Sequence, residues 1–311
     1  MKNIIERVRF KFRDLYEGYY TPWEFFLFCV SSVVRLLTRR DLFLHGKAKV
    51  KRMTKEYLVR EDGHEHYAIK EARLPLLSDP VDYRFFWSFV FFDTFLFYTH
   101  YDDCYDETMT DKYSYQCDEG PYGLRNDMVD VTVKAGDVVF DAGSWIGDFA
   151  AYASAKGALV YAFEPSDSSY KYLLQTASLN KNIHAVKKGL GNAKSKAVIQ
   201  RDSEDSGSDR IVLEKTAKSE EPLVEISTID SFVQENNLPR VDFIKADIEG
   251  YERHMLEGAK ETLKKFAPKL AICTYHLPDD PEILAGIIKN ANPAYNIVQK
   301  KKKLYASVPM A

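Results

Sequence analysis

Acidic and imidazole side chains follow four of the buried strands that the sequence predicts. Asp141 ends an apolar run, Glu164 ends the next, Asp247 and Glu249 follow a third, and His276 follows a fourth. In an open parallel sheet, ligands bind beyond the carboxyl ends of the strands, so we expect these side chains to share one site. A carboxylate can accept hydrogen bonds from hydroxyls, and a neutral imidazole can take a proton at neutral pH. The pattern favours binding and deprotonation of a small polar molecule.

Residues 138–150, VVFDAGSWIGDFA, predict a strand that turns through glycines into a helix. The glycines, Gly143 and Gly147, have the spacing G-x-x-x-G and not the G-x-G-x-x-G spacing of dinucleotide sites. Asp141 and Asp148 would repel a pyrophosphate at the helix start. They suit a cationic ligand without phosphate, such as S-adenosyl-L-methionine. We therefore assign Asp141, Gly143 and Gly147 to cofactor binding.

Glu164 lies 21 residues after Gly143 and is placed to accept hydrogen bonds from both ribose hydroxyls of that cofactor. NAD sites use an acidic residue in the same way, so an NAD-dependent dehydrogenase stays an alternative. Tyr122, in the segment Asp118–Gly123 before the first strand, is a further cofactor contact if that segment folds over the ligand. The alternative for Tyr122 is an ordinary turn.

If the sulfonium methyl group of such a cofactor is transferred to an oxygen, the reaction is a direct displacement that requires alignment of the two atoms and removal of a proton. We predict His276 as the general base and Asp247 as the group that orients the acceptor. A buried histidine with a structural hydrogen bond is the alternative. Asp247, Glu249 and Glu252 could also charge a helix N-terminus or ligate Mg²⁺. Because no further carboxylate is placed by the sequence to complete a metal site, we expect none here.

Strands and helices alternate regularly after residue 115, which is typical of a parallel sheet with helices on both faces. We predict strands at Val138–Asp141, Leu159–Phe163, Ile183–Lys188, Val241–Lys245 and Leu270–Thr274, and a terminal hairpin of Tyr295–Gln299 and Leu304–Val308. The predicted helices are Gly147–Lys156, Asp167–Asn180, Thr228–Asn236, Glu252–Lys265 and Pro281–Asn290. The polar stretch Arg201–Glu221 is expected to be a mobile insertion.

The part of the chain after residue 115 resembles the FkbM family of S-adenosylmethionine-dependent methyltransferases. The matching stretches are GDVVFDAGSWIGDFA, VYAFEP, TIDSF, VDFIKADIEGYE and LAICTYH. The resemblance implies a class I methyltransferase (Rossmann-like) α/β fold with a reversed terminal hairpin. It also implies O-methylation of a hydroxyl on a saccharide or a related small molecule.

Residues 1–114 form a mixed N-terminal region in this interpretation, and residues 115–311 form the methyltransferase domain. Two helices are expected before Arg40, then a hairpin over Lys49–Lys70, then the aromatic-rich segment Tyr83–Tyr105. Basic and apolar residues alternate at helical spacing between Ile4 and Arg13. This pattern fits a helix docked on its own protein or a peripheral membrane contact. The aromatic region keeps a non-catalytic cofactor- or glycan-binding module open as an alternative.

Composition limits the remaining classes. The chain has 311 residues and a net charge of −3, which gives no reason to expect a nucleic-acid partner. Its four cysteines form no CxxC pair, which favours a reduced, cytoplasmic protein. The first apolar block lacks the features of a signal peptide and is too short to span a bilayer. Neither the acceptor nor the oligomeric state follows from these observations.

Overall fold

The structure is a computed structural model. It describes residues 21–38, 48, 51–52, 55–61, 63–78, 121–200, 210–212 and 223–309. The chain divides into two compact units, Met1–Val59 and Arg60–Ala311. The predicted boundary at residue 114/115 lies outside the described residues and stays a prediction. The same holds for the basic segment Ile4–Arg13 and for Tyr83–Tyr105.

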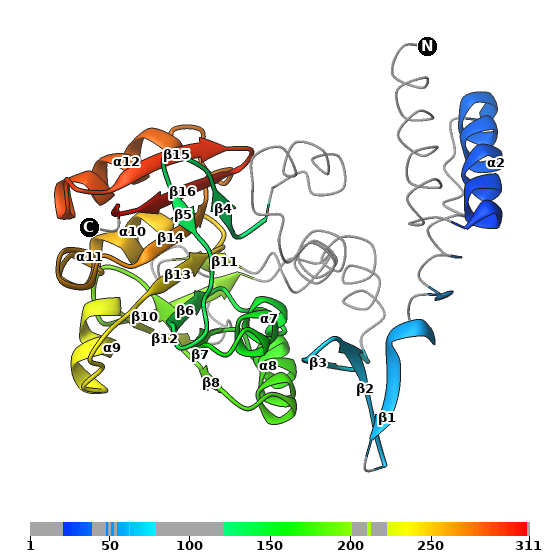
Figure 1. Cartoon of the computed structure of the whole chain (residues 1–311), viewed down its shortest axis with the longest axis horizontal. Helices are drawn as coiled ribbons and strands as arrows, with labels where there is room; N and C mark the ends of the chain where they lie inside the picture. The colour runs from blue at the N-terminus through cyan, green and yellow to red at the C-terminus, as the bar shows by residue number, and fades with distance from the viewer. Residues whose placement is uncertain are drawn as a thin grey trace. The chain divides into compact units, whose positions relative to one another are not determined.

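A seven-stranded sheet forms the centre of the larger unit (Figure 1). Its order is β15-β16-β14-β13-β6-β7-β8. The bounds are β6 (Val138–Ala142), β7 (Leu159–Phe163), β8 (Ile183–Val186), β13 (Phe243–Ala246), β14 (Lys269–Cys273), β15 (Asn296–Lys300) and β16 (Lys303–Ser307). The first five in chain order are parallel, and β16 runs antiparallel to both of its neighbours. This arrangement confirms the class I methyltransferase fold with its reversed terminal hairpin.

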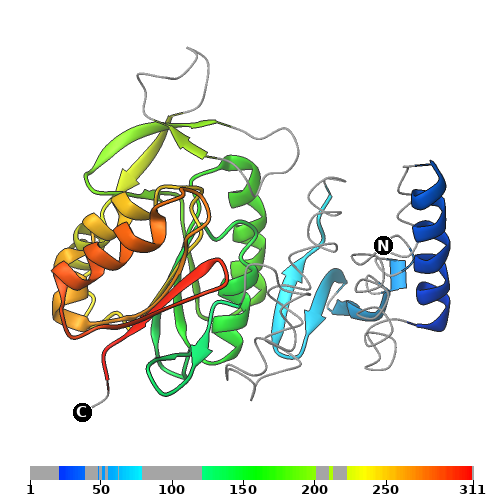
Figure 2. The same cartoon turned by 90° about the horizontal axis from the view of Figure 1, so that it is seen from above.

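Helices cover both faces of this sheet, as Figure 2 shows. α7 (Asp148–Ala155) and α8 (Asp167–Leu179) lie on one face, and α10 (Glu252–Glu257), α11 (Lys260–Phe266) and α12 (Asp280–Ala291) lie on the other. β6 is buried along its whole length, as expected for a central strand of a parallel sheet. Phe140 packs edge-on against Phe232 of α9 (Ile229–Glu235), at 5.6 Å between ring centroids. Side chains of this kind form the core between the sheet and the helices that cover it.

The structure differs from the predicted elements in two places. The single helix predicted over Glu252–Lys265 is wrong, because α10 and α11 are separated at Gly258. A Cβ atom at Gly258 would lie 2.0 Å from the Gly191 carbonyl oxygen, so the chain needs glycine at this contact. A second sheet, order β11-β10-β12-β9, was not predicted. Its strands are β9 (Gly189–Leu190), β10 (Ser195–Gln200), β11 (Arg210–Val212) and β12 (Leu223–Ser227). Apart from β11, the predicted insertion lies outside the described residues.

Short elements precede the large sheet in the chain. α2 (Pro22–Thr38) confirms the second of the two helices expected before Arg40. β1 (Leu58–Glu61), β2 (His64–Ile69) and β3 (Ala72–Pro75) form a sheet in that order, which confirms a hairpin with Gly63 in its turn. The predicted bounds Lys49–Lys70 are wrong at the start, because the described residues 51–52 and 55–57 are helical. β4 (Leu124–Arg125) pairs with β5 (Asp130–Val131). Among the helices in the described ranges, none has the length and apolar character needed to cross a membrane.

The β2-β3 hairpin is fastened to α8 by side chains. Asn180 accepts a hydrogen bond from the Arg73 backbone N–H at 3.0 Å and donates one to the Arg73 carbonyl at 2.7 Å. The Tyr172 hydroxyl and the Ser78 hydroxyl lie 2.9 Å apart, within hydrogen-bond distance. These contacts secure α8, which packs on the loop that follows β6.

Candidate active site

The two glycines of the loop after β6 serve different purposes. Both have left-handed backbones, with φ of 71° at Gly143 and 86° at Gly147. A Cβ at Gly143 would lie 1.8 Å from the Asp247 carbonyl oxygen, so this loop touches the backbone that follows β13. A Cβ at Gly147 would lie 2.8 Å from Leu173 of α8. Gly143 therefore allows the loop after β6 to contact the backbone after β13, and Gly147 allows the same loop to pack closely on α8.

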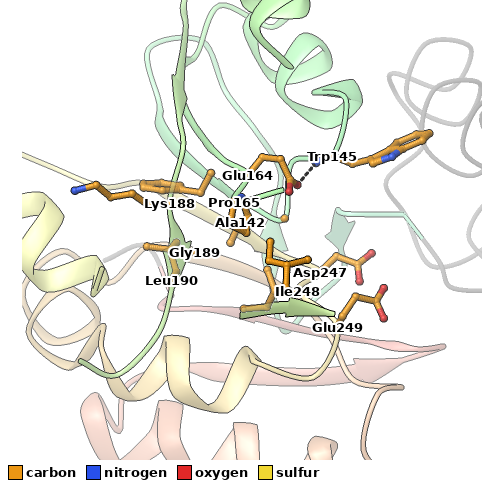
Figure 3. Close-up of a pocket in the computed structure, with 13 residues that line it drawn as sticks. Ala142, Trp145, Glu164, Pro165, Lys188, Gly189, Leu190, Asp247, Ile248 and Glu249 are labelled. Carbon is orange, nitrogen blue, oxygen red and sulfur yellow. Dashed lines mark hydrogen bonds between the residues drawn. The ribbon is translucent and has the colours of Figure 1, made fainter. Parts of the chain in front are cut away.

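A pocket opens at the carboxyl ends of the parallel strands (Figure 3). It is lined by Ala142, Gly143, Trp145, Phe163, Glu164, Pro165, Lys188, Gly189, Leu190, Ile199, Asp247, Ile248 and Glu249. Three of the predicted site residues, Gly143, Glu164 and Asp247, thus line one cavity. Four other predicted site residues do not line the cavity, namely Asp141, Gly147, Tyr122 and His276. They lie behind the lining or beside it.

Glu164 is held in place by backbone donors from both sides. Its Oε2 accepts a hydrogen bond from the Trp145 N–H at 3.0 Å, and its Oε1 accepts one from the Ser166 N–H at 2.8 Å. The residue is 8% exposed. Each carboxylate oxygen can accept more than one hydrogen bond, so these two backbone donors do not exclude a ligand hydroxyl as a further donor.

Asp141 is fully buried, and its charge is paired inside the protein. The Lys245 ammonium lies 3.1 Å from Asp141 Oδ1 and also donates a hydrogen bond to the Gly143 carbonyl at 2.6 Å. Lys245 and Asp141 are register partners on the adjacent strands β13 and β6. The structure therefore differs from the expectation that Asp141 attracts a cationic ligand directly. Asp141 instead holds Lys245, and Lys245 holds the glycine loop.

Asp148 has a raised pKa. Its burial, together with the nearby Asp141 charge, raises its pKa to about 6, although Lys245 acts in the opposite direction. Of the two carboxylates expected to repel a pyrophosphate, Asp141 is thus paired with a lysine, and Asp148 is still mostly ionised at neutral pH but becomes protonated below about pH 6.

Asp247 lies at the centre of a network of polar contacts. The Tyr122 hydroxyl donates a hydrogen bond to Asp247 Oδ2 at 2.5 Å, and the Tyr275 hydroxyl donates one to Oδ1 at 3.2 Å. Burial raises the pKa of Asp247, but the charges of Lys245 and Lys303 outweigh burial and lower it. Asp247 is therefore ionised at neutral pH. Tyr122 contacts this carboxylate, not the pocket surface.

His276 is surrounded by carboxylates. Its Nδ1 lies 3.0 Å from Glu252 Oε1, and its Nε2 lies 3.6 Å from Asp247 Oδ1 and 3.5 Å from Glu249 Oε2. Burial lowers the pKa of His276, but the neighbouring Glu249, Glu252 and Asp247 outweigh burial and raise it to about 10. The ring is thus an imidazolium at neutral pH. This differs from the neutral base expected from the sequence, which cannot show that three carboxylates converge on one ring.

Comparison with known proteins gives the family. Residues 137–292 match the model of the methyltransferase FkbM domain, a range that covers half of the chain. It contains the glycine loop, Glu164, Asp247 and His276. The chain belongs to the FkbM methyltransferase family. The dehydrogenase alternative is therefore discarded.

Individual relatives are more distant. Hexuronic acid methyltransferase AglP from Haloferax volcanii is 26% identical over 167 residues, which are 52% of this chain and 66% of AglP. The crystal structure of methyltransferase FkbM from Methylobacillus flagellatus KT has 21% identity and a TM-score of 0.45, over 74% of this chain and 56% of that one. Aeropyrum pernix fibrillarin with natively bound S-adenosyl-L-methionine has 12% identity and a TM-score of 0.37, over 58% of this chain and 70% of that one.

Two residues of the site lie outside the range that matches the FkbM domain. Tyr122 precedes it and Lys303 follows it, yet the Lys303 ammonium lies 4.2 Å from the centroid of the Tyr122 ring. The Lys245 ammonium lies 5.0 Å from the same centroid. Sequence reasoning missed both lysines, Trp145 and Tyr275. Lys245 could have been found by pairing the predicted strands β6 and β13 in register.

Replacing Lys245 with methionine should destabilise the protein by about 3–5 kcal/mol, because it leaves the buried Asp141 charge without a partner. The double variant Lys245→Met/Asp141→Asn should lose clearly less, since the unpaired charge is then removed as well. Urea unfolding of the wild type, both single variants and the double variant measures this coupling. Additive losses would mean that the two side chains do not interact.

The free energy of unfolding should fall as pH rises from about 6.5 to about 10, through a contribution that His276→Gln removes. In this window the folded chain retains a proton that the unfolded chain releases, so raising the pH favours unfolding. Urea unfolding at several pH values, in chelated buffer, measures the slope. The control is His184→Gln, which replaces an exposed ring stacked on Tyr161. Equal slopes for wild type and His276→Gln would contradict the raised pKa.

Proposed function

We propose that this protein transfers a methyl group from S-adenosyl-L-methionine to an oxygen of a saccharide. The observation that carries the proposal is the pocket at the strand ends of an FkbM-family chain, which joins Gly143, Glu164 and Asp247. Glu164 stands on the cofactor side, and Asp247 with Glu249 stands on the acceptor side.

The pocket offers the contacts that an adenosine moiety requires. The Glu164 carboxylate would accept hydrogen bonds from the two ribose hydroxyls, while its own backbone donors keep it oriented. Phe163, Leu190 and Ile199 supply apolar walls for the base. Gly143 lets the loop lie directly against the backbone of Asp247, because any side chain there would overlap the Asp247 carbonyl. When bound, the cofactor supplies the electrophilic methyl group.

On the acceptor side, Asp247 is the ionised group that can accept a hydrogen bond from an incoming hydroxyl. This hydrogen bond would align the hydroxyl oxygen with the methyl group. The Asp247 carboxylate would then receive the hydroxyl proton as the carbon–oxygen bond forms. A role for His276 as the base would require the ring to lose its own proton first. We therefore assign His276 to the positioning of Asp247 and Glu249. The curated relative AglP is named for a hexuronic acid, which supports a saccharide acceptor.

A carboxylate of a sugar acid is the second candidate acceptor. The imidazolium state of His276 favours it, because a carboxylate needs no base before it attacks a methyl group. The products differ in chemistry. A hydroxyl acceptor gives a methyl ether, whereas a carboxylate acceptor gives a methyl ester.

Glu164→Gln should weaken S-adenosyl-L-methionine binding at least tenfold. The change keeps the shape of the side chain but removes the charge from hydrogen bonds that contribute roughly 1.5–3 kcal/mol each. Isothermal titration calorimetry measures the affinity. The control is Asp167→Asn, which changes an exposed carboxylate three residues further along the chain. Unchanged affinity for Glu164→Gln would remove this residue from the cofactor site.

The wild-type protein should transfer labelled methyl groups from S-adenosyl-L-methionine to members of a panel of neutral sugars and sugar acids. Treating each product with mild alkali distinguishes the two acceptors, because esters release methanol and ethers do not. Heat-inactivated protein is the control. Binding of the cofactor without any transfer, over the whole panel, would favour the non-catalytic module instead.

A further inference from the structure

We propose that Asp247, Glu249 and His276 bind a divalent metal cation at the acceptor side of the pocket. Within the described part of the chain, these three residues each offer a ligand atom, and the three atoms all lie within 4.8 Å of one another. Asp247 and Glu249 come from the loop after β13, and His276 comes from the loop after β14.

The spacing suits a cation. Two ligand atoms that each lie about 2.1 Å from one ion are separated by roughly 3 Å when adjacent and 4.2 Å when opposite. His276 Nε2 is 3.6 Å from Asp247 Oδ1 and 3.5 Å from Glu249 Oε2. Small side-chain adjustments would bring all three atoms onto one ion.

The burial and orientation of His276 give independent support. The side chain is 7% exposed, and neither ring nitrogen has a correctly aligned hydrogen bond within the part of the chain that the structure describes. Nδ1 faces Glu252, so Nε2 is the nitrogen that faces the two proposed carboxylate ligands. A histidine that binds a metal through one nitrogen commonly has a carboxylate behind the other.

Glu252 fits that supporting position. It is fully buried, and its Oε1 accepts a hydrogen bond from the Ile248 N–H at 2.9 Å. The same oxygen is the one that lies 3.0 Å from His276 Nδ1. Glu252 is thereby fixed to the loop that carries Asp247 and Glu249, and it would hold the ring in the orientation that metal binding needs.

The ligand set also indicates the kind of cation. Three carboxylates surround one imidazole in this cluster, and a divalent cation that displaced the Nε2 proton of His276 would balance their charge. Two carboxylate oxygens with one imidazole nitrogen suit Mn²⁺ or Mg²⁺ better than metals that prefer sulfur. The sequence analysis expects no metal because no further carboxylate is placed to complete a site, and the sequence does not show that the His276 ring meets the carboxylates.

A cation here would act on the acceptor, and this part rests on the proposed function. Asp247 and Glu249 line the same pocket as Glu164, and Figure 3 shows their carboxylates on one side. A hydroxyl bound to the cation would have a lower pKa and would pass its proton more readily to the Asp247 carboxylate. Its oxygen would then form a bond to the methyl carbon as the carbon–sulfur bond breaks, and the sulfonium would leave as a neutral thioether.

Electron paramagnetic resonance with Mn²⁺ tests the site without cofactor or acceptor. We expect the free Mn²⁺ signal to fall to a limit of one ion per chain. Glu249→Gln and His276→Gln should each weaken binding at least about tenfold. Glu257→Gln, which changes an exposed carboxylate of α10, should leave the affinity unchanged. No loss of free signal, or equal affinities for all variants, would overturn the proposal.

The wild-type protein provides a check that does not depend on variants that fold. Pulsed measurements on bound Mn²⁺ should show coupling to a ¹⁴N nucleus of one histidine, and absence of that coupling would overturn the assignment of His276. Labelled-methyl transfer after chelation then tests the catalytic role. Transfer without Mn²⁺ binding would overturn the metal site and leave the proposed function. Binding with transfer that chelation does not reduce would overturn the role of the cation.

Discussion

The buried ion pair of Asp141 and Lys245 is the interaction on which the rest of the site depends. It joins the central strands β6 and β13 one residue before each strand ends. Lys245 also binds the Gly143 carbonyl, so the pair fixes the loop that forms one wall of the pocket. Because both charges are buried, losing either partner would leave the other uncompensated. The ends of β6 and β13 can therefore lie side by side, because the charges of Asp141 and Lys245 compensate each other.

Charge is distributed unevenly around Asp247. On one side, Lys245 and Lys303 lie against the ring of Tyr122, whose hydroxyl is bonded to Asp247. On the other side, His276 faces Glu249 and Glu252. Asp247 thus contacts both the basic side and the acidic side of the site, and the lysine charges keep its carboxylate ionised. An acceptor oxygen that reaches Asp247 would meet positive charge from the lysines and hydrogen-bond acceptors from the cluster.

The range that matches the FkbM domain contains most of the residues of this site but not all of them. The glycine loop, Glu164, Asp247 and His276 lie within residues 137–292. Tyr122 and Lys303 come from segments on either side, and both contribute to the surroundings of Asp247. The chain also spans only 66% of AglP. The surroundings of Asp247 are therefore built partly by segments outside the matched range.

The sequence by itself determined the five parallel strands, the terminal hairpin and the glycine loop, because apolar runs and glycine spacing are local signals. It also placed Glu164 and Asp247 at strand ends, and the strand order then brought them to one pocket. Only the tertiary structure decided the charges. Asp141 pairs with Lys245 across two strands separated by about 100 residues in the chain, and His276 meets carboxylates from a different loop. A side chain's protonation depends on burial and on neighbours that are distant in sequence, so no local pattern could show that His276 is positively charged.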